Sequence, residues 1–347
     1  MSPSTPAQDQ SEIFNGTAAV GFKDARSADG TDTRAVPAFV IGDELAELAE
    51  TDQRIAVLTA DLGRSNRTLD FAARHPERFV NVGIAEKNMV TMAAGMAASG
   101  MVPFAATFGS FAALLCAEQI RTDCAYPGLP VRIVGHHSGM SMGFYGTSHH
   151  SLEDLAILRS IADLAVVCAT DANHLRSLLR LSLDHPGAMY LRLGRGRDPE
   201  VYSAPPELEL GRAVTVREGT DLTIIATGST VHPSLAAAEQ LDAQGLSARV
   251  VDMWSVQPLD SAAVLAAARE TGAVLTVEEA NVRGGLGSAV AECLADAGTA
   301  VRLRRHGIPG EHVPVGPPAA LYAHYRLDAP GIAAVARELT DTDRSTP

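Results

Sequence analysis

Short apolar runs alternate with longer segments of helical pattern along most of this sequence. Five runs in the first half and four in the second have the length and composition of buried strands. Strands that alternate with helices are typical of a parallel sheet covered by helices on both faces. We therefore predict an α/β fold with two parallel-sheet, three-layer α/β/α domains. The expected strands are residues 54–60, 101–107, 131–135, 164–169, 188–193, 221–228, 247–253, 273–279 and 300–305.

A proline-rich segment interrupts this alternation and separates the two predicted domains. Residues 198–211 contain three prolines and several acidic side chains, as an interdomain linker would. We place the first domain at residues 34–200, the linker proper at 201–211 and the second domain at 212–345. Residues 1–33 are rich in small and polar side chains, and we expect them to form a flexible amino-terminal arm.

The charge and the cysteine content exclude several classes of protein. A net charge of −13 argues against nucleic-acid binding, which requires a basic face. The four cysteines form no C-x-x-C pair, so neither a zinc ribbon nor a thioredoxin-type site is indicated. The amino terminus lacks the pattern of a signal peptide, and no apolar run reaches the ~18 residues that span a membrane. We expect a cytoplasmic protein with reduced thiols and no membrane contact.

One carboxylate, Glu86, stands in the segment NVGIAEKNMV (81–90), at the start of a helix predicted over 84–99. As a structural residue it would stabilise the positive end of the helix dipole by ~0.3–1 kcal/mol. The rest of the helix is small and apolar, which predicts burial. A buried glutamate can hold or share a proton near neutral pH, as a catalytic acid or base must. Both interpretations are open at this point.

Two phenylalanines, Phe108 and Phe111, lie three residues apart in the segment TFGSFAALL (107–115) and would share one helical face. Such a pair usually packs in a core. It can also form a stacking wall for a flat heterocycle. The spacing alone does not choose between these roles.

A loop at residues 135–154 holds four histidines, four glycines and four serines directly after an expected strand. Open α/β sheets bind ligands at the carboxyl ends of their strands, so we predict a polar substrate loop here. A histidine metal site is less favoured, because no cysteine or carboxylate completes a convincing ligand set. No metal ligand is therefore assigned to this chain.

Arginines follow two other expected strands, in RLGRGR (192–197) and ADLGRSN (60–66). Guanidinium groups at strand ends suit an anion such as a sugar phosphate, although a solvated basic turn has the same composition. The segment RGGLGSAVAE (283–292) has a G-x-G but lacks the third glycine of a dinucleotide-binding motif. We interpret it as a tight turn between a strand and a helix.

Together these segments resemble the thiamine diphosphate-dependent transketolase family. The resemblance runs over residues 34–340 and is carried by the joint pattern, since each motif alone is weak. It implies a transketolase pyrimidine-binding domain followed by a transketolase C-terminal domain. The matching segments are ADLGRSNRTLDFAARHPERFVNVGIAEKNMV, FAATFGSF, EQIRTDCAYPGLPVRIVGHHSG, SLEDLAILRSI, YLRLGRG, TIIATGSTV, VVDMWSVQPLD and VEEANVRGGLGSAVAE.

The resemblance implies that five residues contribute to cofactor binding. Glu86 matches the catalytic glutamate, which in this family hydrogen-bonds N1′ of the aminopyrimidine and so helps to remove the C2 proton of the thiazolium. Phe108 and Phe111 match the residues that stack on the pyrimidine. Leu114 replaces the third aromatic residue of that wall, and Asp61 matches a residue close to the thiazolium.

The resemblance also implies contacts with the substrate. Ser65, His137 and Arg195 match positions that contact phosphate or sugar, and Arg34 is a further candidate. His149 matches the histidine of the family's D-G-x-T-H run, which contacts substrate oxygens. We therefore expect His137 and His149 to take part in catalysis.

The histidine loop departs from the family pattern G-E-D-G-x-T-H-Q. Phe144 and Tyr145 replace the acidic pair, Ser148 replaces Thr and His150 replaces Gln. The missing aspartate normally reads the hydroxyl next to the reacting carbonyl. We therefore expect Phe144 and Tyr145 to line the substrate site and to alter substrate choice. In addition, Lys87 stands where the family usually has His or Gln.

The diphosphate-binding part of a transketolase is missing from this pattern. The sequence has no G-D-G motif followed by an Asn-rich stretch, the residues that hold Mg²⁺ and the diphosphate in the family. The chain therefore resembles the C-terminal subunit of a split transketolase. The resemblance implies a partner, an N-terminal subunit that holds Mg²⁺. It also implies thiamine diphosphate shared between the two chains, and an α2β2 heterotetramer.

The activity implied is transfer of a two-carbon ketol unit from a ketose, expected to be phosphorylated, to an aldehyde-type acceptor. The beta subunit of a 2-oxoacid dehydrogenase decarboxylating component shares the architecture, but the ADLGRSN run and the histidine loop favour transketolase. A 1-deoxyxylulose 5-phosphate synthase is less favoured, because that chain is normally not split. A non-catalytic assembly subunit is the alternative from outside the enzymes.

Overall fold

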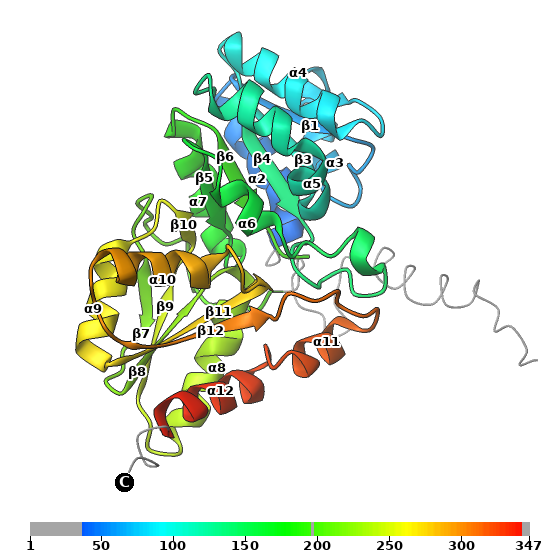
Figure 1. Cartoon of the computed structure of the whole chain (residues 1–347). Coiled ribbons are helices and arrows are strands. Elements are labelled where there is room, and N and C mark those ends of the chain that lie inside the picture. The colour runs from blue at the N-terminus through cyan, green and yellow to red at the C-terminus, as the bar shows by residue number, and fades with distance from the viewer. Residues whose placement is uncertain (1–36, 196–197, 342–347) are drawn as a thin grey trace, which may run out of the picture.

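A computed structural model describes residues 37–195 and 198–341 of the chain (Figure 1). Within these ranges the chain forms a seven-stranded and a five-stranded sheet, each with helices on both faces. Most neighbouring strands run parallel. The predicted α/β class with two three-layer units is therefore confirmed. The predicted arm at 1–33 and Arg34 lie outside the described residues.

The first sheet has the strand order β10-β5-β6-β4-β3-β1-β2. Its long strands are apolar and buried along their whole length, because helices cover both faces of a parallel sheet. The five strands expected in this half of the sequence are all present, and the short strand β2 adds to them. The strands are β1 (Ile55–Thr59), β2 (Phe79–Asn81), β3 (Val102–Phe108), β4 (Arg132–His136), β5 (Ala165–Cys168), β6 (Met189–Arg192) and β10 (Ser255–Gln257).

Two groups of helices cover this sheet. On one face lie α4 (Glu86–Ala98), α5 (Gly109–Gln119), the π-helical turn η3 (Ile120–Ala125) and α6 (Asp154–Arg159). On the other lie α2 (Pro37–Thr51), α3 (Leu69–Arg74) and α7 (Ala172–Asp184). Helix α7 begins where the Asp171 side chain accepts a hydrogen bond from the His174 backbone N–H at 2.8 Å, an ordinary N-cap.

The second sheet has the strand order β12-β11-β8-β9-β7. Its strands are β7 (Val214–Arg217), β8 (Leu222–Ala226), β9 (Ala248–Asp252), β11 (Ala273–Asn281) and β12 (Arg302–Ile308). Helices α8 (Val231–Asp242), α11 (Pro318–His324) and α12 (Ala329–Asp341) pack on one face. Helices α9 (Ser261–Thr271) and α10 (Leu286–Asp296) pack on the other.

Each sheet is mainly parallel and has one antiparallel strand at its edge, which the sequence did not predict. Strand β7 pairs antiparallel with β9. Strand β10 pairs antiparallel with β5, although it comes from the second half of the sequence. Both are short, four and three residues, and such runs leave too weak a periodicity to be recognised. The second half of the chain therefore completes the first sheet, and the sequence-based domain limits stay predictions.

The chain's relation to membranes and to disulfide formation can be stated for the described ranges. No helix there is long and apolar enough to cross a lipid bilayer. All four cysteines lie within these ranges and form no disulfide; three are buried and Cys293 is partly exposed.

Candidate functional site

The candidate site residues lie in a row along one edge of the first sheet. Parallel strands end at the same edge, and β6, β4, β3, β1 and β2 are neighbours in that order. Open α/β sheets bind ligands at this carboxyl edge. Taken along the row, Arg195 follows β6, His137 follows β4, Phe108 ends β3, Asp61 follows β1 and Glu86 follows β2 after a short loop.

Asn81, the last residue of β2, links the two loops that carry Asp61 and Glu86. Its Oδ1 accepts hydrogen bonds from the backbone N–H groups of Asp61 at 3.0 Å and Gly83 at 3.1 Å, and its Nδ2 donates to Asp61 Oδ1 at 3.3 Å. Asp61 has a φ of 61°, which few non-glycine residues adopt. The sequence pattern does not single out Asn81, because an asparagine near a glycine reads as an ordinary turn residue.

Glu86 is the first residue of α4 and is only 8% exposed. The burial predicted from the apolar helix is therefore confirmed, and the carboxylate lies at the positive end of the helix dipole. Burial raises the pKa of the Cys116 thiol on α5 to about 12, and the Glu86 charge adds to that effect. The carboxylate therefore lies close to α5, the helix that also carries Phe111.

Aromatic rings from three segments pack around Phe108. Its ring centroid lies 4.8 Å from that of His137, 5.5 Å from Phe111 and 5.6 Å from His149. The His149 ring also lies 5.3 Å from Phe111 and 4.8 Å from Tyr145. Phe108 ends β3 whereas Phe111 is in the first turn of α5, so the predicted shared helical face is wrong. The two rings meet across a strand-to-helix junction, and with the histidines they form what we call the ring wall.

Burial lowers the pKa of both histidines of the ring wall. It lowers the pKa of His137 well below its ordinary value, and the nearby His136, Arg195 and His149 lower it further. It also lowers the pKa of His149, with a further contribution from His150. A neutral imidazole has one donor and one acceptor nitrogen, so each ring can donate to or accept from a substrate oxygen.

Phe144 and Tyr145 lie at the tip of the loop that follows β4, with 53% and 47% of their surface exposed. The Tyr145 ring contacts His149, and Ser148 Oγ lies 2.9 Å from His149 Nδ1. One of the two residues that replace the family's acidic pair is therefore in direct contact with a candidate catalytic histidine.

The remaining predicted residues are less tightly placed. Ser65 is half-buried in the loop after β1. Arg195 Nη1 donates to the Ser141 carbonyl at 3.4 Å, which places this arginine beside the histidine loop. Leu114 is 55% exposed on α5, so in the single chain it faces solvent and not the ring wall's buried side.

The polar atoms around the ring wall suit a flat heterocycle with donors and acceptors at its edge. Ser110 Oγ and His137 Nδ1 are buried and have no hydrogen-bond partner in the part of the chain that the structure describes. Buried polar atoms of this kind generally require a partner, which a bound ligand would supply. By contrast, across residues 37–195 and 198–341 no group of three or more His, Cys, Asp or Glu side chains is placed to hold a metal ion.

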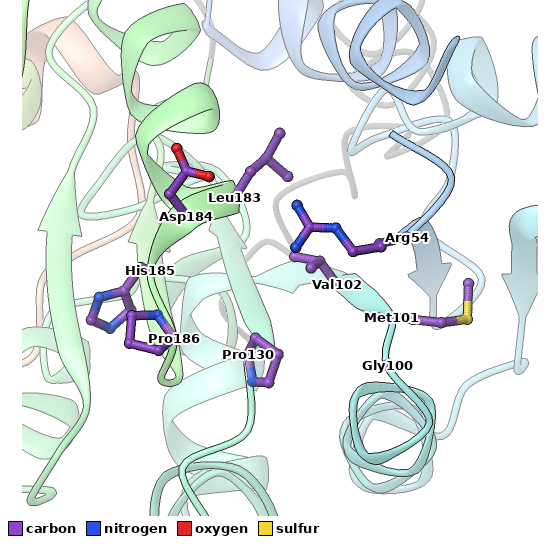
Figure 2. A pocket seen from close by; sticks show the side chains of 9 residues that line it. All are labelled: Arg54, Gly100, Met101, Val102, Pro130, Leu183, Asp184, His185 and Pro186. Carbon is purple, nitrogen blue, oxygen red and sulfur yellow. The ribbon is translucent and has the colours of Figure 1, made fainter. Parts of the chain in front are cut away.

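A separate pocket of about 260 Å³ lies at the opposite end of the same sheet (Figure 2). Its lining includes Arg54 just before β1, Val102 at the start of β3, Pro130 before β4 and His185 after α7. The Arg54 guanidinium is already paired with Asp52 at 2.6 Å. Because this is the amino end of the parallel strands, we do not assign the functional site to this pocket.

The α/β fold and the row of candidate residues at the carboxyl edge of the first sheet define a class of protein. It is the class of α/β enzymes that bind their ligand where parallel strands end. Residues 38–199 match the transketolase pyrimidine-binding domain, and residues 211–332 match the transketolase C-terminal domain. The chain therefore belongs to the transketolase family, as the sequence predicted, and is a transferase of the transketolase type.

Similar chains occur as separate subunits. An apulose-4-phosphate transketolase subunit of Phocaeicola vulgatus is 41% identical over 297 residues, which are 85% of this chain and 95% of that protein. The 6-deoxy-6-sulfo-D-fructose transketolase subunit SqwH of Clostridium sp. (strain MSTE9) is 41% identical over 299 residues, 86% of this chain and 92% of that protein.

A solved structure of a separate transketolase subunit is also similar to this chain. A split-gene transketolase, described as an inactive β4 tetramer, is 40% identical with a TM-score of 0.81, over 89% of this chain and 98% of that chain. These similarities confirm the predicted kinship with the C-terminal subunit of a split transketolase.

Proposed function

We propose that this chain supplies the pyrimidine-binding half of a thiamine diphosphate site shared with a second polypeptide. The observation that supports this most strongly is the row of Glu86, Phe108 and His137 along one edge of the first sheet. A buried carboxylate, a ring wall and unpartnered buried polar atoms suit the aminopyrimidine ring. When bound, the cofactor supplies the electron sink that allows a carbon–carbon bond of a ketose to break.

Each residue of this row has a distinct proposed role. Glu86 shares a proton with the pyrimidine ring. Phe108 and Phe111 orient that ring by stacking and exclude water from it. Asp61 lies in the loop after β1, the strand next to that of Phe108, and Asn81 holds it there by hydrogen bonds. It is assigned to the thiazolium end of the cofactor. Stacking of the pyrimidine on the ring wall requires no charged side chain in that wall.

The histidines and the nearby polar residues are proposed to handle the sugar. Burial lowers the pKa of His137 and His149, which favours the neutral imidazole, a form that can move a proton at a substrate hydroxyl or carbonyl oxygen. Arg195 and Ser65 are assigned to a phosphate group, as is Arg34 by its sequence match. The reaction proposed is transfer of a two-carbon ketol unit from a phosphorylated ketose to an aldehyde-type acceptor.

Substrate choice is proposed to differ from that of an ordinary transketolase. Tyr145 contacts His149 where the family pattern has an aspartate, and its phenol offers a single neutral oxygen that donates as well as accepts, whereas a carboxylate offers two charged acceptor oxygens. The two subunits at 41% identity are named for different sugars, apulose 4-phosphate and 6-deoxy-6-sulfofructose. Sequence identity of about 41% therefore does not determine which sugar is the substrate. The exposed Phe144 and Tyr145 at the loop tip support an acceptor that differs from that of an ordinary transketolase.

A partner chain is proposed to hold the diphosphate and Mg²⁺, with two copies of each chain in an α2β2 assembly. In support, the first domain exposes several large apolar side chains in and beside α4, α5 and η3, which a partner chain could cover. They are Ile84, Met92, Leu114, Leu115 and Tyr126. The unpaired thiols agree with assembly in the cytoplasm.

Reconstitution tests the proposal directly. This chain and its partner are purified separately and assayed alone and mixed, with thiamine diphosphate, Mg²⁺ and xylulose 5-phosphate as donor. Release of glyceraldehyde 3-phosphate in the presence of an aldehyde acceptor should require both chains. Equal activity of this chain alone would contradict a shared site. Activity with ribose 5-phosphate at ordinary transketolase rates would contradict the altered acceptor choice.

The same mixture separates the alternatives. Pyruvate-dependent reduction of an electron acceptor, without ketol transfer, would identify a 2-oxoacid decarboxylating component. Full activity of a Glu86→Ala complex would leave only an assembly role for this chain.

A further inference from the structure

The loop that carries Tyr145 and His149 is closed at its base. The backbone N–H of Gly139 donates to the Ser151 carbonyl, and the N–H of Ser151 donates to the Gly139 carbonyl, both at 3.0 Å. We call residues 139–151 the substrate loop, and this pair of hydrogen bonds joins its two ends.

A carboxylate of the second domain holds the base of the substrate loop. Glu279, on β11, is 1% exposed. Its Oε1 accepts the backbone N–H of Met140 at 2.5 Å, and its Oε2 accepts the Ser229 hydroxyl at 2.7 Å. The same carboxylate also accepts a hydrogen bond from the Tyr322 side chain on α11, so it joins the loop of the first domain to Ser229 and Tyr322 of the second.

Arg192 reinforces this attachment from the end of β6. Its Nη2 donates to the Ser151 carbonyl at 3.0 Å and to the Glu279 carbonyl at 2.9 Å. Its Nε donates to Asp154 Oδ2 at 2.7 Å, just after the loop. Arg192 therefore links Ser151, at the end of the substrate loop, to Glu279. The same glutamate holds Met140, at the start of the loop.

Gly139 shows how closely the loop base lies on this carboxylate. It has a φ of +60°, and a Cβ built there would be 2.1 Å from Glu279 Cδ. No side chain fits between them, so backbone and carboxylate are in direct contact.

The tip of the substrate loop also contacts the second domain, beside the start of α11 (Figure 1). The Gly316 N–H donates to the Gly143 carbonyl at 3.0 Å, and Thr147 Oγ1 lies 3.4 Å from His312 Nδ1. Residues 312–316 therefore support the part of the loop that presents Phe144 and Tyr145.

We infer that the second domain positions the substrate loop, with Glu279 as the positioning residue at the base and residues 312–316 as the support at the tip. This inference deepens the proposed function and rests on it for its catalytic consequence. Glu279 acts through Met140 and Ser151, whose placement sets where His149 and Tyr145 meet a sugar.

The test compares two adjacent buried glutamates. Glu278 is the matched control: it is fully buried on the same strand, but its oxygens accept the N–H groups of Leu286 and Gly287 in α10 and not a backbone group of the substrate loop. Glu279→Ala and Glu278→Ala are each prepared in the full chain assembled with its partner. Hydrogen–deuterium exchange of residues 139–149 is measured, together with KM and kcat for donor and acceptor.

Glu279→Ala should raise exchange in the substrate loop by about tenfold or more, because local opening loses a buried attachment. KM for the sugar should rise by about tenfold with a smaller change in kcat, as expected when a binding surface is misplaced. Glu279→Gln keeps one acceptor oxygen and should restore most of both. Equal loop exchange in the Glu279→Ala and Glu278→Ala complexes would overturn the inference.

A second variant covers the case in which Glu279→Ala fails to fold. Thr147→Val removes the hydroxyl that faces His312 at the exposed tip, and should raise exchange at 143–149 without lowering the melting temperature. Unchanged exchange at the tip would count against the support by residues 312–316. Exchange needs no turnover, so loop loosening in a complex that transfers no ketol unit would refute the proposed function while the loop attachment stands.

Discussion

Asn81 and Asp61 are joined by two hydrogen bonds that run in opposite directions. The Asp61 N–H donates to Asn81 Oδ1 at 3.0 Å, and Asn81 Nδ2 donates to Asp61 Oδ1 at 3.3 Å. Asn81 also accepts the N–H of Gly83, three residues before Glu86. One amide therefore fixes the relation between the loop after β1 and the loop that leads into α4.

Replacing Asn81 should weaken cofactor binding more than it weakens the fold. Asn81→Ala removes all three hydrogen bonds at an exposed position, so we expect little change in melting temperature. Affinity for thiamine diphosphate in the assembled complex should fall by about tenfold, the effect of about 1.4 kcal/mol. Titration of the cofactor against intrinsic fluorescence measures it.

The Asn81→Asp variant tests which of the hydrogen bonds of Asn81 matters for cofactor binding. It keeps an acceptor for the two N–H groups but loses the donor to Asp61 and adds a like charge beside it. We expect it to bind the cofactor no better than Asn81→Ala. Recovery of wild-type affinity in Asn81→Asp would show that the contact with the Asp61 carboxylate is irrelevant.

Tyr145→Asp should shift acceptor preference toward hydroxylated aldehydes. The carboxylate restores the acceptor that the family pattern has at this position, beside His149. A hydrogen bond of this kind changes discrimination by about tenfold. The measurement is the ratio of kcat/KM for an acceptor with and without the hydroxyl next to its aldehyde. An unchanged ratio would mean that Tyr145 does not read that part of the sugar.

The buried pair of Arg192 and Asp154 should contribute strongly to stability. Their atoms are 2.7 Å apart, and their side chains are 2% and 0% exposed. Removing one partner of a buried pair leaves the other charge uncompensated, at a cost of about 3–5 kcal/mol. Asp154→Asn should therefore lower the urea midpoint markedly.

The exposed pair of Arg121 and Glu118 is the control for this prediction. Both side chains are largely exposed, at 60% and 62%. Glu118→Ala should change the free energy of unfolding by less than about 1 kcal/mol, because solvent screens the pair. Equal urea midpoints for Asp154→Asn and Glu118→Ala would contradict the prediction.

Asp252 should make stability depend on pH between about 4 and 7. Burial raises its pKa from 3.8 to about 7, against hydrogen bonds from Thr170 and Tyr202 that lower it. The folded protein therefore holds this proton more tightly than the unfolded chain, and stability falls as pH rises through this range by up to about 1.4 kcal/mol per unit. Above about pH 7 the loss is complete.

Asp252→Asn should mimic the protonated form and remove this slope. Its melting temperature should match that of the wild type near pH 4.5 and exceed it at pH 7.5. Asp296→Asn, at an exposed position on α10, serves as the control. A difference between Asp252→Asn and the wild type that is the same at both pH values would refute the assignment.

Much of the fold could be predicted because its strands are buried and apolar. β1 and β3 are long enough for local pattern to identify them, and helix α4 follows its predicted range closely. Strand β10 could not be predicted, because three residues carry no periodicity and its partner β5 is far away in the sequence. The placement of such a strand depends on tertiary packing alone.

The candidate site also contains residues that the sequence could reveal and residues that it could not. Glu86 and the Phe108–Phe111 pair stand out by residue type and by the family pattern. Glu279 does not, since in VEE (277–279) it looks like the polar end of a strand. Two consecutive glutamates inside a buried strand were the available signal, because buried carboxylates need partners. Which partners they find depends on how the two domains meet.

The most direct test of the central claim is ketol transfer by the assembled complex carrying Glu86→Gln. Glutamine keeps the size of the side chain but cannot share a proton as a carboxylate does, so kcat should fall by about 10²–10⁴-fold. Thiamine diphosphate should still bind, and Glu239→Gln, an exposed glutamate on α8, should leave the rate unchanged. A Glu86→Gln complex that turns over within twofold of the wild type, a ratio worth about 0.4 kcal/mol, would contradict the account.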